Sequence, residues 1–253
     1  MSEIIYGRHP ILAALRQEGS PLEEVIVARG TRGKWLEEVR HLSRAAGVRF
    51  RVLERAALDR LCGTSHHQGV VARRAGYAYR QEEDLEPYLG GVSAPALLVA
   101  VDGLTDPMNL GNLARSALAA GAHGLIIPRD RAVGVTPAVA KAAAGALEYL
   151  AVFRVTNLAQ CLMRLKDAGL AVIGTDAASS FSLYDADLTG PLVLVIGSED
   201  KGLRPLVRRQ CDLVLSIPLA APEINSLNAA TAGAVALFEV RRQRLKKWGG
   251  GGG

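Results

Sequence analysis

Five nearly continuous apolar runs after residue 94 constrain the fold of this 253-residue chain more than any other feature. The runs span residues 96–101, 124–128, 170–175, 192–197 and 213–219. Strands covered on both faces lose the polar alternation of half-exposed strands, so such runs are typical of a parallel sheet. Helical spacing between or after them is found at 110–120, 137–149, 158–168 and 226–248. This alternation predicts an α/β domain built on a parallel sheet.

A smaller α/β region precedes these runs. Helices are expected at 9–17, 34–46 and 56–61, and strands at 24–28, 48–53 and 69–73. We therefore expect a first domain over 1–75, a linker with an acidic cluster over 76–93, and a second domain over 94–248. The five glycines at 249–253 cannot pack and are expected to form a disordered tail.

Charge is distributed unevenly between the two regions. Residues 1–75 hold 13 of the chain's 30 Lys and Arg residues but only 8 of its 25 Asp and Glu residues, so the net charge of +5 lies there. A basic module suits the phosphates of RNA. A solvated basic surface without a partner is the alternative.

Metal, disulfide and membrane classes are not supported by the residues. Cys62, Cys161 and Cys211 are odd in number and far apart, which argues against a disulfide framework and a zinc site. His66 and His67 are adjacent and poorly spaced to share one metal ion, so no metal is expected. The first residues lack a signal pattern, and no apolar run reaches the ~20 residues that span a bilayer. We expect a cytoplasmic protein that does not enter membranes.

Hydrolases and nucleotide-dependent enzymes lack their fingerprints here as well. There is no G-x-S-x-G elbow for a serine hydrolase, and His123 is expected to pack at a helix–strand junction. No G-x-G-x-x-G motif follows any expected strand. Leu203 stands where a phosphate loop that starts at Gly197 would need lysine.

Polar residues gather after three of the expected strands, at the edge where parallel sheets bind ligands. After the first strand come Asn109, Asn112 and Arg115, which share one helix face at a spacing of three. A cation in the first turns of a helix is disfavoured by the helix dipole, so Arg115 suggests that an anionic ligand binds there. A helix cap with a surface arginine is the alternative.

Two further clusters follow the last two strands. Gly197 permits a sharp turn that places Glu199 at the mouth of the sheet. Asn225 or Ser226 suits a helix N-cap, with Asn228 in the first turn, so capping explains only one of these three side chains. The small residues from 229 to 234 predict that this last helix packs closely on a neighbour.

Together these clusters resemble the three ordered motifs of the SpoU/TrmH family of ribose 2′-O-methyltransferases. They are Asn109-x-Gly111-x-x-x-Arg115, Ile196-Gly197-Ser198-Glu199-x-x-Gly202, and Ile217-Pro218 followed by Ser226-Leu227-Asn228. The stretches 5–9, 67–72 and 102–111 are similar to a bacterial subgroup that methylates a guanosine in the peptidyl-transferase loop of large-subunit ribosomal RNA. The resemblance covers essentially the whole chain.

The resemblance implies a SPOUT fold, in which the second domain carries a trefoil knot and the first is an L30e-like RNA-binding domain. It implies a homodimer that uses S-adenosylmethionine (S-adenosyl-L-methionine) to methylate ribosomal RNA. The implied cofactor-binding residues are Gly174, Thr175, Gly197, Ile217 and Leu227. The implied catalytic residues are Arg115, Asn109, Glu199, Ser226 and Asn228.

Within this resemblance, Arg115 contacts the 2′-oxygen and the adjacent phosphate. A guanidinium keeps its proton below about pH 12, so we expect it to stabilise charge while a phosphate or water takes the proton. Asn109 and Glu199 would orient Arg115 and the ribose, and Ser226 and Asn228 would bind the cofactor or the nucleotide. The three clusters must then meet at one pocket.

The last motif departs from the family after Asn228, and the residues 222–225 before it resemble an insertion. Ala229 and Ala230 follow Asn228 where Val-Ser is usual, which removes a hydroxyl and a β-branched contact. Two alternatives stay open. One is the same chemistry on transfer RNA or another ribosomal site, and the other is a non-catalytic RNA-binding or ribosome-assembly protein, which need not bind S-adenosylmethionine.

Overall fold

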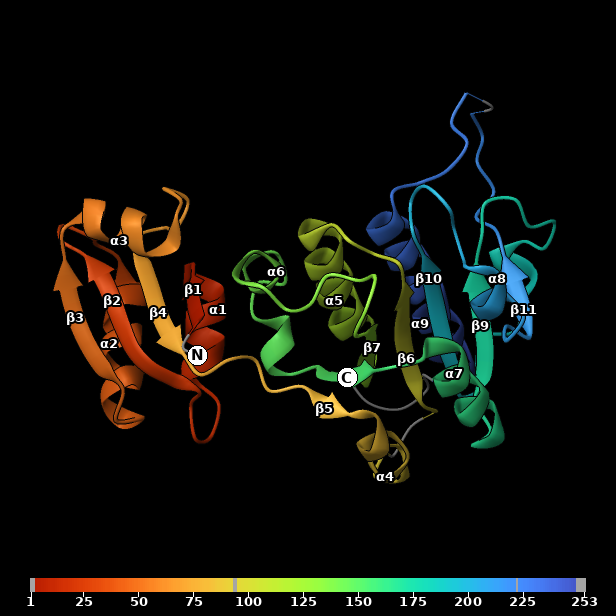
Figure 1. Ribbon diagram of the computed structural model, residues 1–253, viewed down its shortest axis with the longest axis horizontal. Helices are drawn as coiled ribbons and strands as arrows, with labels where there is room; N and C mark the ends of the chain where they lie inside the picture. Colours follow the sequence, from red (N-terminus) through yellow and green to blue (C-terminus); the bar gives the residue numbers. More distant parts are fainter. Residues whose placement is uncertain (1–2, 93–94, 222, 249–253) are drawn as a thin grey trace. The chain divides into compact units, whose positions relative to one another are not determined.

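The computed structural model describes residues 3–92, 95–221 and 223–248, so the expected tail at 249–253 lies outside the described residues. Its contacts divide the chain into two units (Figure 1). The first unit comprises Met1–Ala78 and Val135–Tyr149, and the second comprises Tyr79–Gly134 and Leu150–Gly253. Within the described residues, no helix has the length and apolar character needed to cross a membrane.

The segment Val135–Tyr149 differs from its prediction, which assigned it to the second domain with one helix over 137–149. It forms α6 (Pro137–Ala142) and the 3-10 turn η2 (Ala146–Glu148), and α6 contacts strand β1 of the first unit. Arg74 donates to Glu148 at 2.8 Å, with both side chains almost fully buried. Separating a buried ion pair leaves an unpaired charge inside the protein, which is strongly unfavourable. These two groups therefore hold the segment on the first unit.

The first unit contains a four-stranded sheet in the order β1-β4-β2-β3. Its strands are β1 (Glu3–Tyr6), β2 (Leu22–Ala28), β3 (Arg49–Leu53) and β4 (Val70–Arg74). Its other helices are α1 (Arg8–Leu15), α2 (Lys34–Ala45) and α3 (Arg55–Cys62). The predicted elements between residues 9 and 73 are confirmed to within two residues. Strand β1 was missed because four residues are too few to display a period.

The second unit is built on a seven-stranded sheet in the order β11-β9-β10-β6-β7-β8-β5, and every neighbouring pair is parallel. Five strands confirm the apolar runs: β6 (Leu97–Asp102), β7 (Gly124–Pro128), β9 (Ala171–Thr175), β10 (Leu192–Gly197) and β11 (Leu213–Leu215). Two were not predicted: β5 (Arg80–Gln81) and β8 (Ala151–Val155). The expected linker thus supplies an edge strand, which is followed by α4 (Leu85–Gly90).

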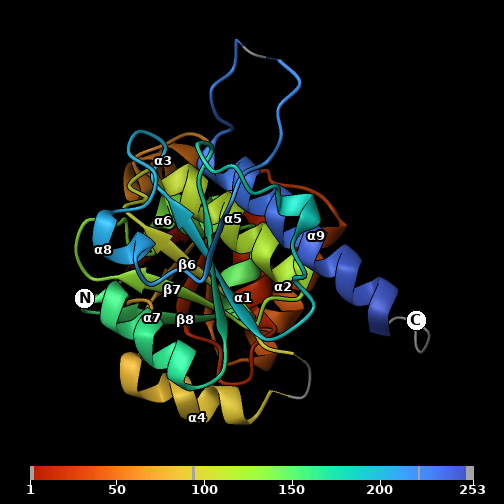
Figure 2. The same cartoon turned by 90° about the vertical axis from the view of Figure 1, so that its right-hand side faces the viewer.

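Helices cover both faces of this sheet (Figure 2). Helix α7 (Leu158–Asp167) buries Leu162 and Leu165 against one face, next to the short α8 (Pro205–Arg208). Helices α5 (Pro107–Ala120) and α9 (Ala229–Trp248) pack on each other and cover the opposite face. A Cβ on Gly233 of α9 would lie 2.5 Å from Leu113 Cδ1 of α5. The predicted close packing of the last helix is therefore confirmed.

The strand register brings the predicted polar clusters to one edge. Gly197 at the end of β10 pairs with Asp102 at the end of β6, and Ile196 pairs with Thr175 at the end of β9. Leu215 of β11 also pairs with Thr175. Because all these strands run the same way, the loops that follow them open at the same edge of the sheet.

Candidate active site

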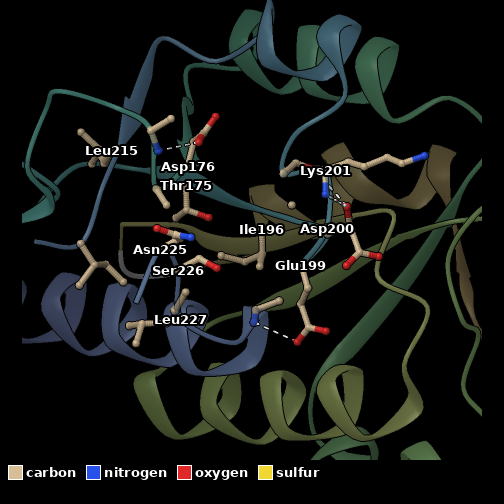
Figure 3. Close-up of a pocket in the computed structure, with 18 of the residues that line it drawn as sticks. Thr175, Asp176, Ile196, Glu199, Asp200, Lys201, Leu215, Asn225, Ser226 and Leu227 are labelled. Atoms are coloured by element: carbon tan, nitrogen blue, oxygen red, sulfur yellow. Dashed lines mark hydrogen bonds between the residues drawn. The ribbon is translucent and has the colours of Figure 1, made fainter. Parts of the chain in front are cut away.

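A cavity of about 390 Å³ opens at the carboxyl ends of β9, β10 and β11 (Figure 3). Its lining includes six of the predicted site residues: Thr175, Gly197, Glu199, Ile217, Ser226 and Leu227. The walls are largely aliphatic, through residues such as Ile196 and Leu215, and the lining also includes carboxylates. Pockets of this size, apolar with a few polar groups, are typical of small-molecule and cofactor sites.

Gly197 is required by the turn that closes one side of the cavity. Ser198 and Gly202 exchange backbone hydrogen bonds of 3.1 and 2.9 Å, which fold the chain back on itself. A Cβ on Gly197 would lie 2.4 Å from the carbonyl carbon of Gly202. The glycine therefore serves the tight turn predicted from the sequence, and this turn carries Glu199.

The three polar clusters meet through Asn109, Glu199 and Asn228. Asn109 Nδ2 donates to Glu199 Oε1 at 2.7 Å, and Asn228 Nδ2 donates to Asn109 Oδ1 at 2.9 Å and also to Glu199 Oε1. The backbone N–H of Ala229 adds a longer contact to the same carboxylate oxygen, at 3.4 Å (Figure 3). One oxygen of Glu199 is thus surrounded by donors. Among the described residues, the other oxygen has no hydrogen-bond partner.

Helix caps fix two members of this group. The Asp106 carboxylate accepts from the backbone N–H groups of Met108 and Asn109 at 3.2 and 3.1 Å, so α5 begins at Pro107, earlier than predicted. Asn228 Oδ1 accepts from the N–H of Ala230 at 3.0 Å. Asn228, and not Asn225 or Ser226, therefore caps α9. The prediction was wrong here because three cap-forming residues lie close together in the sequence.

A buried carboxylate holds the far end of the Glu199 loop. Asp102 is fully buried at the end of β6, where it accepts from the backbone N–H of Arg204 at 2.7 Å and from its Nε at 2.5 Å. A carboxylate in this environment is stable only when it is paired. The pair ties the segment that follows Gly202 to the neighbouring strand.

Both units match known protein families. Residues 96–238 match the SpoU rRNA Methylase family, and residues 4–80 match a family described as RNA 2′-O ribose methyltransferase substrate binding. This chain belongs to the SpoU rRNA methylase family.

Relatives and solved structures of the family match over nearly their full lengths. The chain is 41% identical to the 23S rRNA (guanosine-2′-O-)-methyltransferase RlmB of Ralstonia nicotianae, over 96% of each chain. It is 43% identical to RlmB of Yersinia pestis, over 96% of this chain and 98% of that protein. The structure of the SpoU methyltransferase AviRb from Streptomyces viridochromogenes in complex with AdoMet superposes with a TM-score of 0.79, at 31% identity over 97% and 91% of the two chains.

Arg115, the arginine of the first SpoU motif, is not part of the Asn109–Glu199–Asn228 group. It lies six residues beyond Asn109 on α5, about 9 Å along the helix axis, and its side chain is exposed. In the part of the chain that the structure describes, no hydrogen bond or ion pair involves its guanidinium. The expected orientation of Arg115 by Asn109 and Glu199 is therefore not seen as a direct contact.

Gly174 is the one residue of the expected SpoU cofactor set that does not line the cavity. A Cβ there would lie 2.6 Å from Leu203 Cδ1 and 2.9 Å from Cys211 Sγ, so this glycine permits close packing beneath the loop. Burial raises the pKa of the Cys211 thiol to about 11. The thiol therefore stays protonated near neutral pH and acts as a packing group.

Asp176 lines the cavity and was missed by the sequence analysis of the SpoU motifs. It directly follows β9, accepts from the N–H of Ala178 at 2.9 Å and pairs with Arg208. The signal that could have found it is its position, as the first carboxylate after a strand of the parallel sheet. On this strand the implied cofactor set ended at Thr175, one residue before it, and none of the three motifs reaches this position.

Proposed function

We propose that this protein transfers a methyl group from S-adenosylmethionine to the 2′-hydroxyl of a guanosine in 23S ribosomal RNA. The observation that carries the chemistry is the meeting of Asn109, Glu199 and Asn228 beside the cavity, in a chain that belongs to a methylase family. The target follows from relatives named as 23S rRNA guanosine-2′-O-methyltransferases, which match nearly the whole chain.

The cavity suits the proposed methyl donor. Aliphatic side chains such as Ile196, Leu215 and Leu227 offer an apolar surface for an adenine ring. The lining carboxylates Glu199 and Asp200 complement the positive charges of the sulfonium and the amino group. When bound, S-adenosylmethionine supplies a methyl group that is already activated by its sulfonium, so the proposed reaction calls for no metal.

In this proposal the second oxygen of Glu199, which has no partner among the described residues, accepts a hydrogen bond from the ribose. Its partner oxygen is held by two amides and a backbone N–H, so the carboxylate cannot rotate without breaking these bonds. A 2′-hydroxyl that donates to the free oxygen would be fixed in position with more electron density on its own oxygen. Positioning of this kind is a large part of catalysis by a fixed site.

Arg115 supplies the positive charge in this proposal. A ribose hydroxyl is a weak nucleophile near neutral pH, and its oxygen gains negative charge as the proton leaves. The Arg115 guanidinium stabilises that charge and binds the adjacent phosphate, while the proton passes to water or to a phosphate oxygen. Ser226, which lines the cavity, contacts the donor or the target nucleotide.

The proposal extends to assembly and location. We propose a homodimer in the cytoplasm, with ribosomal RNA held by the basic first unit. Exposed apolar side chains on the second unit support self-association, among them Phe181 at 64% exposure and Phe238 of α9 at 48%. The trefoil knot and the L30e-like character of the first unit stay predictions.

Mapping of 2′-O-methyl marks tests this function. Ribosomal and transfer RNA from cells with and without the protein are compared, and purified protein is then added to the unmodified RNA with S-adenosylmethionine. We expect one large-subunit guanosine to lose its mark and to regain it in vitro. Loss of a mark in transfer RNA instead would favour the alternative substrate. Failure to bind S-adenosylmethionine on titration would favour a non-catalytic RNA-binding protein.

A further inference from the structure

A second cavity, of about 730 Å³, lies on the other side of the Glu199 loop. It opens at the carboxyl ends of β6 and β10 and is lined by the residues after them, together with Arg131 from the β7 loop and Asn157 at the start of α7. Ser198 and Lys201 line both cavities, so a single turn of backbone separates them. The proposed mechanism assigns no role to this second cavity.

Its lining combines an apolar wall with three cationic side chains, those of Arg131, Lys201 and Arg204. Pro205, Leu206 and Val207 form part of the wall, and the Leu206 side chain is 65% exposed although it is aliphatic. Arg204 also lines the cavity, but its charge is paired with the buried Asp102. The remaining cations are therefore the ones available to a ligand.

These cations are Arg131 and Lys201. Both are exposed, and within residues 3–92, 95–221 and 223–248 neither side-chain cation has a hydrogen-bond or ion-pair partner. Figure 3 shows the Lys201 side chain extending away from Asn225 and Ser226, which lie at the first cavity. Two unpaired cations beside an apolar wall complement a phosphate joined to a flat, apolar ring.

The backbone at Arg131 supports a ligand-binding role. Its φ is +62°, a left-handed conformation that costs free energy for a side chain other than glycine, asparagine or aspartate. Glycine at this position would remove the strain. An arginine held in a strained conformation, with no partner within the described residues, is consistent with a contact that forms only when a ligand is present.

We propose that the second cavity binds an unstacked nucleotide of the RNA substrate, with its base against Leu206 and its phosphate at Arg131 and Lys201. The inference rests on the proposed function, because it assumes that the first cavity holds the methyl donor. The second cavity is one loop away from that donor, so a nucleotide bound there would lie close to the transferred methyl group. Enzymes that modify nucleotides gain access by removing them from the stack, and an apolar wall compensates for the stacking that is lost.

Steady-state kinetics with an RNA fragment that spans the mapped guanosine test the proposal. Arg131→Gly removes the cation and the backbone strain together, so the fold should be retained. We expect KM for the RNA to rise about tenfold, as for loss of one charge-assisted hydrogen bond. Affinity for S-adenosylmethionine should stay unchanged, because Arg131 does not line the first cavity. Arg131→Lys should restore most of the loss.

Leu206→Asp tests the apolar wall independently, since it places a negative charge where the base and phosphate would lie. The matched control is Arg209→Ala, which removes an exposed cation at the end of α8 that lines neither cavity. KM values within twofold of the native protein for both Arg131→Gly and Leu206→Asp would overturn the inference. So would an equal rise in the control. If the native protein does not methylate the fragment, it is the proposed function that fails.

Discussion

Two sets of polar side chains in the second unit differ in how they are held. Asn109, Glu199 and Asn228 hydrogen-bond to one another and to the start of α9. The cations Arg115 and Lys201 have no side-chain partner in the described ranges, although both belong to the predicted motif segments. The first set is arranged before any ligand binds, and the second set is left to be completed by one.

This difference separates two kinds of contribution. Groups that are already bonded position a substrate without further reorganisation, which is how a fixed site lowers a barrier. Unpaired cations remain hydrated until an anion displaces the water, so they add little to the stability of the free protein. Substitution of the bonded set should therefore cost both stability and activity, whereas substitution of the cations should cost activity alone.

Arg115→Ala should give the largest effect. We expect kcat for methyl transfer to fall by about 10²–10³-fold, the usual cost of removing one group that stabilises developing charge. The free energy of unfolding and the affinity for S-adenosylmethionine should stay close to those of the native protein, since this side chain has no partner among the described residues. Activity assays with chemical denaturation of the same samples measure both. Native activity would overturn its catalytic role, and a large loss of stability would place Arg115 in the bonded set.

Glu199→Gln should lower both activity and stability. The amide oxygen can replace Oε1 as the acceptor for Asn109 and Asn228, but these bonds lose the carboxylate charge, and the amide nitrogen then faces the ribose, where it cannot accept from the 2′-hydroxyl. We expect kcat to fall by about 10²-fold and the free energy of unfolding to fall by about 1 kcal/mol. Glu223→Gln is the control, an exposed carboxylate that lines neither cavity. If both variants lost the same activity and stability, the hydrogen bonds of Glu199 would have no special importance, and the distinction between bonded and unpaired groups would fail.

Asp102→Asn should cost stability first. The substitution leaves a fully buried amide against Arg204 Nε and weakens the contact that ties the loop to β6. We expect a loss of about 2 kcal/mol in the free energy of unfolding, as for an unsatisfied buried polar group. Asp130→Asn, at an exposed position of the same unit, should change stability by less than about 0.5 kcal/mol. Similar losses in the two variants would mean that the Asp102–Arg204 contact makes no particular contribution to stability.

The site could be predicted from the sequence because the order and direction of the strands decide which loops come together. Parallel strands end at one edge, so polar residues after β6, β10 and β11 had to converge, and Asn109, Glu199 and Asn228 do so. Individual roles were harder to predict. Gly174 lies in the same kind of strand as Gly197, yet its missing side chain serves packing against Leu203.

Long-range contacts set the other limit of prediction. The sequence predicted one more helix of the second domain over 137–149. The Arg74–Glu148 pair and the hydrogen bond from Tyr77 to the Leu147 carbonyl instead join this segment to the first unit. Neither contact leaves a local pattern, because the partners are about 70 residues apart. Strand β8 was missed since Arg154 interrupts its five-residue apolar run.

The substitution of His123, a titrating group, should have the smallest effect on stability. Its Nδ1 accepts from the backbone N–H of Leu97 at 3.1 Å, which confirms its predicted place at a helix–strand junction. Burial, and then the charge of Arg244, lower the pKa of His123, so the folded protein favours the neutral ring. The unfolded chain, with a pKa near about 6.5, binds the proton more readily, so stability should fall as pH drops below about 6.5 and level off below the folded pKa. His123→Asn keeps an acceptor for Leu97 without the titration, and unfolding measured from pH 7.5 to 5 should show a shallower decline in this variant. The same slope in both proteins would show that other groups cause the pH dependence, and that this histidine is held no differently from an exposed one.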